Sequence, residues 1–175
     1  MGVPMHHTQD PLAVRPANPA HLDQRDECRA LLFMYTSEVW GQDYSAFRAQ
    51  DWADQSSDGA TVVSQVVATY TDPRAAEDHV NASYNPNLFN TCNHAEFRAS
   101  VVAAGLMLEL FDFKFNHGLV AWTLSGKYQG QYNGWNMEFL AMHVDNVMVI
   151  SRAGQMGNPA PALASLTDHI IDRIG

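Results

Sequence analysis

Basic residues and cysteines are scarce in this sequence. Its 175 residues contain 10 Lys and Arg against 19 Asp and Glu, which gives a formal net charge of -9 at pH 7, and they contain two cysteines. An excess of negative charge repels the phosphate backbone of nucleic acids and anionic lipid surfaces at long range. The charge balance therefore argues against nucleic acid as a partner.

Long apolar runs are also missing. No stretch approaches the roughly 18 to 20 uninterrupted apolar residues of a membrane-spanning helix, and the N-terminus lacks the apolar core of a secretory signal. We expect a soluble chain, with any signal or membrane tether lying outside it. Residues 1–20 contain four prolines and little periodicity. They are predicted to be a flexible leader, followed by one folded domain at 21–175.

Catalytic and cofactor motifs are sparse. The sequence has no G-x-S-x-G elbow, no H-E-x-x-H pair, no P-loop and no G-x-G-x-x-G turn. Cys92 and His94 are one residue apart, with Asp78 and His79 upstream, and all four are residue types that bind metals. The simpler interpretation places His79 on a helix surface and His94 at the start of a strand. We therefore predict no enzyme, no cofactor and no metal site.

The remaining composition is that of a globular domain, with 46% hydrophobic and 10% aromatic residues. Periodicity and capping signals, of which Asp72-Pro73 is the clearest, predict helices at 23–34, 73–84 and 161–174. Alternating patterns predict strands at 44–52, 60–70, 94–103, 106–115, 119–128, 135–144 and 146–152. The connections between consecutive strands are too short for parallel crossovers. We predict an α+β fold with an antiparallel β-sheet and helices packed against it.

Two segments carry further expectations. The last helix has one apolar stripe, made of Leu163, Leu166, Ile170 and Ile174. Its remaining positions, among them Thr167, Asp168 and Arg173, are expected to face water. The Asn-rich stretch 81–93 has side chains suited to a polar ligand, since amides both donate and accept hydrogen bonds. Such a stretch more often ends a helix and forms turns, so it is predicted to be a loop.

The two cysteines, Cys28 and Cys92, allow two interpretations. In an oxidising compartment they would close a long loop and stabilise the fold. In a reducing compartment they would be two buried thiols, because cysteine often behaves as a small apolar core residue. The residues alone leave both alternatives open.

Several short motifs in this chain are similar to one known family. They are the acidic residue before Cys28, the segment 44–50, the Val-rich strand ending at Tyr70, Ala75-Ala76, the aromatic Phe89 before Cys92, Trp135-Asn-Met137, and the segment 146–149. Together they resemble the mycobacterial PknH-like extracellular sensor domain, which occurs on receptor Ser/Thr kinases and in related exported lipoproteins. The resemblance covers about residues 20–174.

The resemblance implies an extracellular or cell-envelope location and a disulfide between Cys28 and Cys92. It also implies a cleft between sheet and helix that is suited to a ligand. The residues predicted to line this cleft are Phe113, Trp122, Tyr128, Trp135 and Asn146.

The sequence departs from the family pattern at three points. Met137 stands at the position of a later family cysteine, the partner of that cysteine is missing from the strand after Cys92, and Phe89 stands where Trp is usual. A second family disulfide therefore cannot form. The chain shows neither a kinase segment nor a lipid-bearing cysteine. The sequence therefore does not decide whether the parent protein is a kinase, a lipoprotein or a free secreted domain.

Three functions are compatible with these observations. The first is an exported, non-catalytic sensor that binds an unknown small molecule or cell-envelope component in a cleft. The second is a secreted protein-interaction or structural module that uses a sheet edge or an apolar patch. The third is a small cone-shaped α+β enzyme with an internal His and Asp pair. The sequence identifies neither the ligand nor the oligomeric state.

Overall fold

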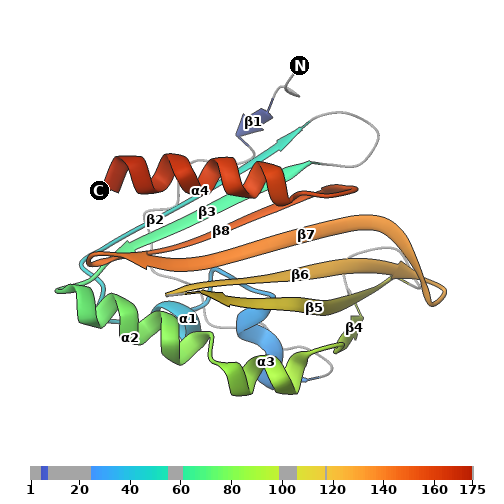
Figure 1. The fold of residues 1–175 in the computed structure, drawn as a ribbon, viewed down its shortest axis with the longest axis horizontal. Helices are drawn as coiled ribbons and strands as arrows, with labels where there is room; N and C mark the ends of the chain where they lie inside the picture. Colours follow the sequence, from blue (N-terminus) through green and yellow to red (C-terminus); the bar gives the residue numbers. More distant parts are fainter. Residues whose placement is uncertain (1–4, 8–24, 55–60, 99–105, 117, 175) are drawn as a thin grey trace.

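The chain is built around one bent antiparallel sheet (Figure 1). The computed structural model describes residues 5–7, 25–54, 61–98, 106–116 and 118–174. The strands are β1 (Met5–His7), β2 (Ala46–Asp54), β3 (Val62–Thr69), β4 (Glu96–Arg98), β5 (Leu106–Asn116), β6 (Leu119–Tyr128), β7 (Gln131–Val144) and β8 (Val147–Met156). The helices are the 3-10 helix η1 (Asp26–Leu31), α1 (Ser37–Trp40), α2 (Pro73–Ser83), α3 (Pro86–Cys92) and α4 (Ala160–Ile174).

The eight described strands follow the order β1-β2-β3-β8-β7-β6-β5-β4. Every neighbouring pair is antiparallel, which confirms the predicted α+β class. The predicted hairpin is β2 and β3, and the predicted turn at Asp145 separates β7 from β8. Within the segment predicted as a leader, Met5–His7 pair with β2.

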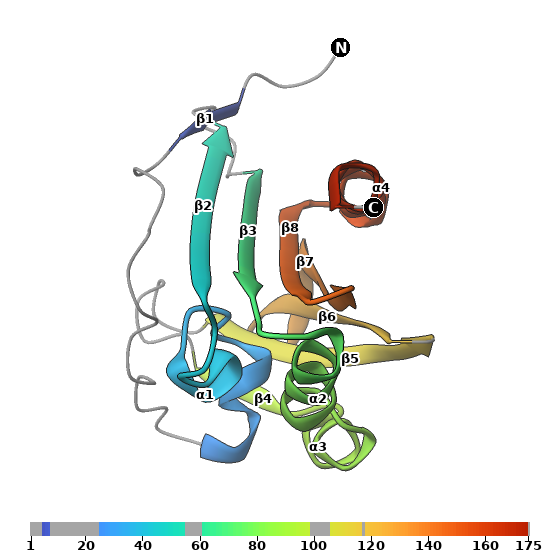
Figure 2. The same ribbon diagram turned by 90° about the vertical axis from the view of Figure 1, so that its left-hand side faces the viewer.

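Both faces of the sheet carry helices (Figure 2). Along β7, alternate residues point to opposite faces, as the period of a strand requires. Phe139 and Ala141 join the larger core, which includes residues of η1, α1, α2 and α3. Leu140 and Met142 join a smaller core that contains Leu163 of α4. The sheet is therefore a central layer between two unequal cores.

The helix predicted from Asp72-Pro73 is α2. The Asp72 carboxylate accepts a hydrogen bond from the Ala75 N–H at 2.9 Å, and Pro73 occupies the first turn, where its missing N–H costs nothing. The predicted Asn-rich loop was wrong in its second half, because residues 86–92 form α3. Asn85 caps α3 through its side-chain oxygen, and Pro86 follows, so the same start signal occurs twice.

Two further expectations need correction. The helix predicted at 23–34 is a 3-10 helix over Asp26–Leu31, and the first two positions of the predicted range lie outside the described residues. Thr167 does not face water but is buried. Its hydroxyl donates a hydrogen bond to the Leu163 carbonyl at 2.8 Å, which satisfies it inside the helix and lets its methyl group face the core.

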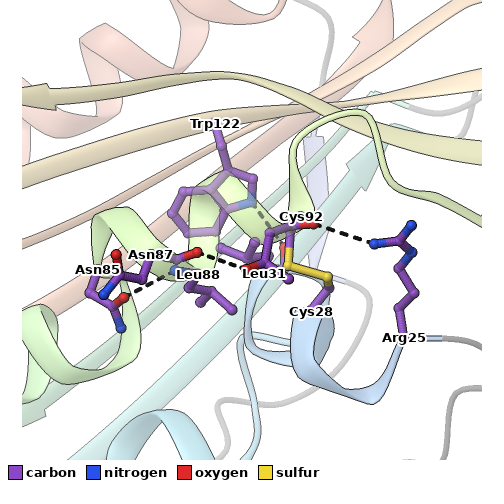
Figure 3. Close-up of a disulfide and its surroundings, with 9 residues drawn as sticks. Arg25, Cys28, Leu31, Asn85, Asn87, Leu88, Cys92 and Trp122 are labelled. Carbon is purple, nitrogen blue, oxygen red and sulfur yellow. Dashed lines mark hydrogen bonds between the residues drawn. A yellow bond between two sulfur atoms is a disulfide. The ribbon is translucent and has the colours of Figure 1, made fainter.

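A disulfide joins Cys28 of η1 to Cys92 at the end of α3, as the resemblance implied (Figure 3). Both residues are fully buried, and their Cα atoms are 5.7 Å apart. The Trp122 indole N–H donates to the Leu31 carbonyl at 2.9 Å, so η1 is also held to the sheet. The disulfide and this hydrogen bond hold η1 and α3 on the same face of the sheet.

Removing the disulfide should lower the free energy of unfolding. Its sequence separation is 64 residues, and the entropy of closing a loop of that length corresponds to about 4 kcal/mol. We expect the double variant Cys28→Ala/Cys92→Ala to lose about this amount in urea unfolding followed by tryptophan fluorescence. The reduced wild-type protein should match the variant. Equal stability of the variant and the oxidised wild type would contradict this account.

Candidate functional site

A groove of about 590 Å³ lies between α3 and β5, and we call it the α3–β5 groove. Its walls combine aromatic rings with a small number of polar side chains. The lining residues are Pro86, Phe89, Asn90, Asn93, His94, Phe111, Asp112, Phe113 and Phe115. This volume falls within the range of roughly 300 to 1,000 Å³ that is usual for small-molecule sites.

The shape of the groove depends on a β-bulge in β5. Phe111 pairs with Thr123 and Lys114 pairs with Ala121, so Asp112 and Phe113 together face one residue of β6. Asp112 has a positive φ of 56°, a conformation that Asp tolerates better than most residues. The extra residue turns Phe113 onto the face that carries α3.

Aromatic contacts join the two walls of the groove. The rings of Phe89 and Phe113 have centroids 4.4 Å apart, and those of Phe89 and Phe115 are 4.8 Å apart. Phe89 also contacts the buried Trp122 at 5.9 Å. Phe89 is buried, whereas Phe115 is about half exposed. The floor of the groove therefore belongs to the core, while its rim presents aromatic surface to solvent.

Polar side chains from α3 and the following residues border the aromatic walls. Asn90 and Asn93 are exposed on α3 and at its end. His94 follows with a positive φ of 59°, and its backbone N–H donates to the Leu110 carbonyl at 2.8 Å. Asp112 accepts a hydrogen bond from Lys114 at 2.7 Å. The groove thus offers amide, imidazole and carboxylate groups beside its aromatic walls.

A buried carboxylate holds His94 in place. Glu109 is 4% exposed and accepts hydrogen bonds from the His94 Nδ1–H at 2.8 Å and the Tyr132 hydroxyl at 2.5 Å. Lys127 forms an ion pair with Glu109 at 2.6 Å and a second one with Glu96 at 2.8 Å. We call these five residues the Glu109 cluster.

Hydrogen bonding keeps the Glu109 carboxylate ionised. Burial alone would raise the pKa of Glu109, but the hydrogen bonds from its three partners outweigh burial and lower the pKa to about 2. The same contacts raise the pKa of Lys127. Because an ionised carboxylate only accepts hydrogen bonds, His94 must carry a proton on Nδ1. Its Nε2 is the nitrogen left for other partners.

A second groove of about 390 Å³ adjoins the first and shares Pro86 and Phe115 with it. Its lining residues are Asn81, Tyr84, Asn85, Pro86, Phe115, Asn116, Gly118, Leu119 and Val120. The Asn-rich stretch therefore contributes to both grooves, with Asn90 and Asn93 in one and Asn81 and Asn85 in the other. The two grooves form a continuous border along α3.

The five residues predicted as ligand-binding lie in different places. Phe113 lines the α3–β5 groove, and Trp122 lies beneath it at 2% exposure. Tyr128 is half exposed at the end of β6, and Trp135 packs against the larger core from β7. Asn146 donates to the Tyr70 carbonyl at 2.9 Å in the β7–β8 turn. The structure brings Phe113 and Trp122 together through Phe89, and a binding role for any of the five stays a prediction.

The sequence identified the other groove residues only in part, for two reasons. Asn90 and Asn93 belong to the stretch whose amides suit a polar ligand, but this stretch and Phe89 were predicted to form a loop, although Asn85-Pro86 signals a helix that would group them. The bulge at Asp112 has no strong sequence signal, and without it the alternation of the β5 phenylalanines does not show which ring faces α3.

The metal-ligand types noted in the sequence have other partners. Cys92 is in the disulfide, and His79 pairs with Asp43 at 2.8 Å. His94 belongs to the Glu109 cluster. Within the described ranges, no three His, Cys, Asp or Glu side chains are grouped closely enough to hold a metal ion.

The Glu109 cluster should make the free energy of unfolding depend on pH in the acidic range. The folded pKa of about 2 lies below the ordinary value of 4.5, so the stabilisation is present above pH 4.5 and is lost as the pH falls toward 2. We expect wild type to lose about 2 kcal/mol more than Glu109→Gln between pH 6 and pH 2 in urea unfolding. Glu77→Gln, on the exposed side of α2, serves as the control and should follow wild type. Parallel curves for wild type and Glu109→Gln would contradict the prediction.

Comparisons with known proteins agree with this architecture. A family model described as the PknH-like extracellular domain matches residues 1–173. The crystal structure of the extracellular domain of PknH from Mycobacterium tuberculosis is similar to this fold, with a TM-score of 0.76 and 18% identity. The match covers 97% of this chain and 84% of that chain. No curated protein matches.

None of the helices described in the structure is long and apolar enough to cross a bilayer. The family model spans nearly the whole sequence. The chain therefore belongs to the PknH-like extracellular domain family and is an extracellular domain.

Proposed function

We propose that this exported, sensor-type domain binds a small molecule or a cell-envelope component in the α3–β5 groove. One observation carries the proposal: four phenylalanines and four polar residues border a concave site of about 590 Å³. Binding sites are usually concave and mostly apolar, with a few polar groups that fix the ligand's orientation. The groove has this composition.

The surroundings of the groove support binding more than catalysis. The described lining residues include no Ser, Cys or Lys that could serve as a nucleophile. His94 donates through Nδ1 to Glu109, and Asp112 is paired with Lys114. Both groups are held in fixed orientations, as a recognition site requires.

α3 connects the groove to the rest of the domain, so a bound ligand could affect other elements through this helix. α3 supplies Phe89 and Asn90 to the groove, and Cys92 at its end is bonded to Cys28 of η1. A sensor responds only if its ligand binds one state more tightly than another. Movement of α3 on binding would be transmitted to η1 through the disulfide.

Native mass spectrometry of the protein exported by its own host should test ligand binding. We expect a reproducible bound mass in wild type and in Asn87→Trp, which changes an exposed residue of α3 outside both grooves. Asn90→Trp should lose at least about tenfold in occupancy, because the indole fills the groove without touching the core.

Two results would overturn the proposal. A bound mass that persists in Asn90→Trp would place the ligand elsewhere. A protein without any bound mass would contradict ligand binding.

A further inference from the structure

The aromatic walls of the α3–β5 groove limit the shape of its ligand. Phe89 and Phe113 meet at an interplanar angle of 38°, and Phe89 and Phe115 meet at 70°. The rings therefore form an angled surface rather than a slot between parallel faces. Such a surface can pack against the outward C–H groups of a puckered ring, because the faces of aromatic rings are negative and attract C–H groups.

The amides at the rim are free to bind. Neither Asn90 nor Asn93 makes a side-chain hydrogen bond with any residue that the structure describes, and both are exposed. Each amide offers one acceptor oxygen and two N–H donors. Two free amides beside apolar rings suit a ligand that both donates and accepts hydrogen bonds at adjacent positions.

The charged groups at the rim are already compensated. Asp112 is paired with Lys114 at 2.7 Å, and the Glu109 carboxylate is paired with Lys127 at 2.6 Å. An anionic ligand would find no unpaired cation among the described lining residues and would meet the repulsion of a chain with a net charge of -9. A cationic ligand would have to displace Lys114 from Asp112. The charge balance favours a neutral ligand.

His94 adds a directional group to this rim. Its Nδ1 is engaged by Glu109 at 2.8 Å, and its side chain is 68% exposed. In the neutral ring, Nε2 is therefore a hydrogen-bond acceptor. A hydroxyl group of the ligand can donate to it while accepting from an asparagine amide.

We infer that the α3–β5 groove binds a neutral, polyhydroxylated ring, and that its ligand is an uncharged carbohydrate or the sugar headgroup of an envelope glycoconjugate. The C–H faces of the sugar would pack on Phe113 and Phe115, and its hydroxyl groups would bond to Asn90 and Asn93. This inference rests on the proposed function, because it names the ligand class of the same groove.

An NMR titration with ¹⁵N-labelled protein should test the ligand class. The probes are three neutral disaccharides (maltose, cellobiose and sucrose), glucose with its charged counterparts glucuronate and glucosamine, tetramethylammonium, and a panel of small aromatic fragments. We expect at least one neutral disaccharide to shift the amide signals of residues 89–94 and 111–115. Glucuronate and glucosamine should bind at least about fivefold more weakly than glucose, because the rim offers them no unpaired partner.

Variants of exposed residues should locate the contacts. Asn90→Ala and Asn93→Ala each remove free amide groups, and each should weaken disaccharide binding about fivefold, the equivalent of one lost hydrogen bond. Asn87→Ala is the matched control on the same helix and should bind like wild type. Because all three side chains are exposed, the variants should keep the wild-type amide spectrum outside α3.

The outcomes separate the two proposals. If aromatic fragments or tetramethylammonium shift residues 89–94 and 111–115 while no sugar does, the carbohydrate assignment is wrong and ligand binding in the groove stands. If a disaccharide binds wild type, Asn90→Ala and Asn93→Ala equally well, the proposed carbohydrate site at the two amides is also wrong. If no probe shifts these residues, and the exported protein carries no bound mass, both proposals are wrong.

Discussion

The link between α3 and η1 is the constraint on which the candidate site depends. α3 has only seven residues, from Pro86 to Cys92, and a helix this short is not stable by itself in water. It is held by the Asn85 cap at its start, by Phe89 in the core, and by the disulfide at its end. The disulfide acts at the point where the chain leaves the helix for the rim of the groove. Without it, one wall of the groove would be held by the Asn85 cap, by Phe89 and Leu88 in the core, and by the hydrogen bond from Arg25 to the Thr91 carbonyl.

The groove itself results from two local departures from regular structure. α3 ends at Cys92, where Asn93 adopts an extended conformation, and the positive φ of His94 then directs the chain toward β5. The positive φ of Asp112 accompanies the bulge in β5. Each conformation costs some stability for a residue with a side chain. Both are held by neighbouring contacts, through Glu109 for His94 and through Lys114 for Asp112. The two strained residues that open the groove are thus also its charged or titratable lining residues.

The sequence predicted an element correctly where one local interaction determines that element. Asp72-Pro73 predicted the start of α2 because a cap and a proline act locally. Runs of β-forming residues bounded by turn signals predicted β5, β6 and β8, although β6 and β8 bury residues on both faces. The same local signal at Asn85-Pro86 was outweighed by the number of asparagines around it, which favour turns. Thr167 was misplaced because its hydroxyl bonds within α4, and that contact depends on the helix already being formed. The rim of the groove is harder still to predict from the sequence, because its shape depends on where the β5–β6 pairing places its bulge.

The second disulfide that the resemblance implies for the family would involve a central strand of this sheet. Met137, at the position where the resemblance places a cysteine, pairs with Leu124 of β6 and Gly154 of β8. It is buried, and a Cβ atom added to Gly154 would lie 3.0 Å from its methyl carbon, so the methionine side chain covers the glycine closely. A residue in a central strand is held on both sides by backbone pairing, whereas Cys92 ends a short helix at the margin of the fold. The cysteines that this chain has therefore anchor a short helix that carries proposed binding residues.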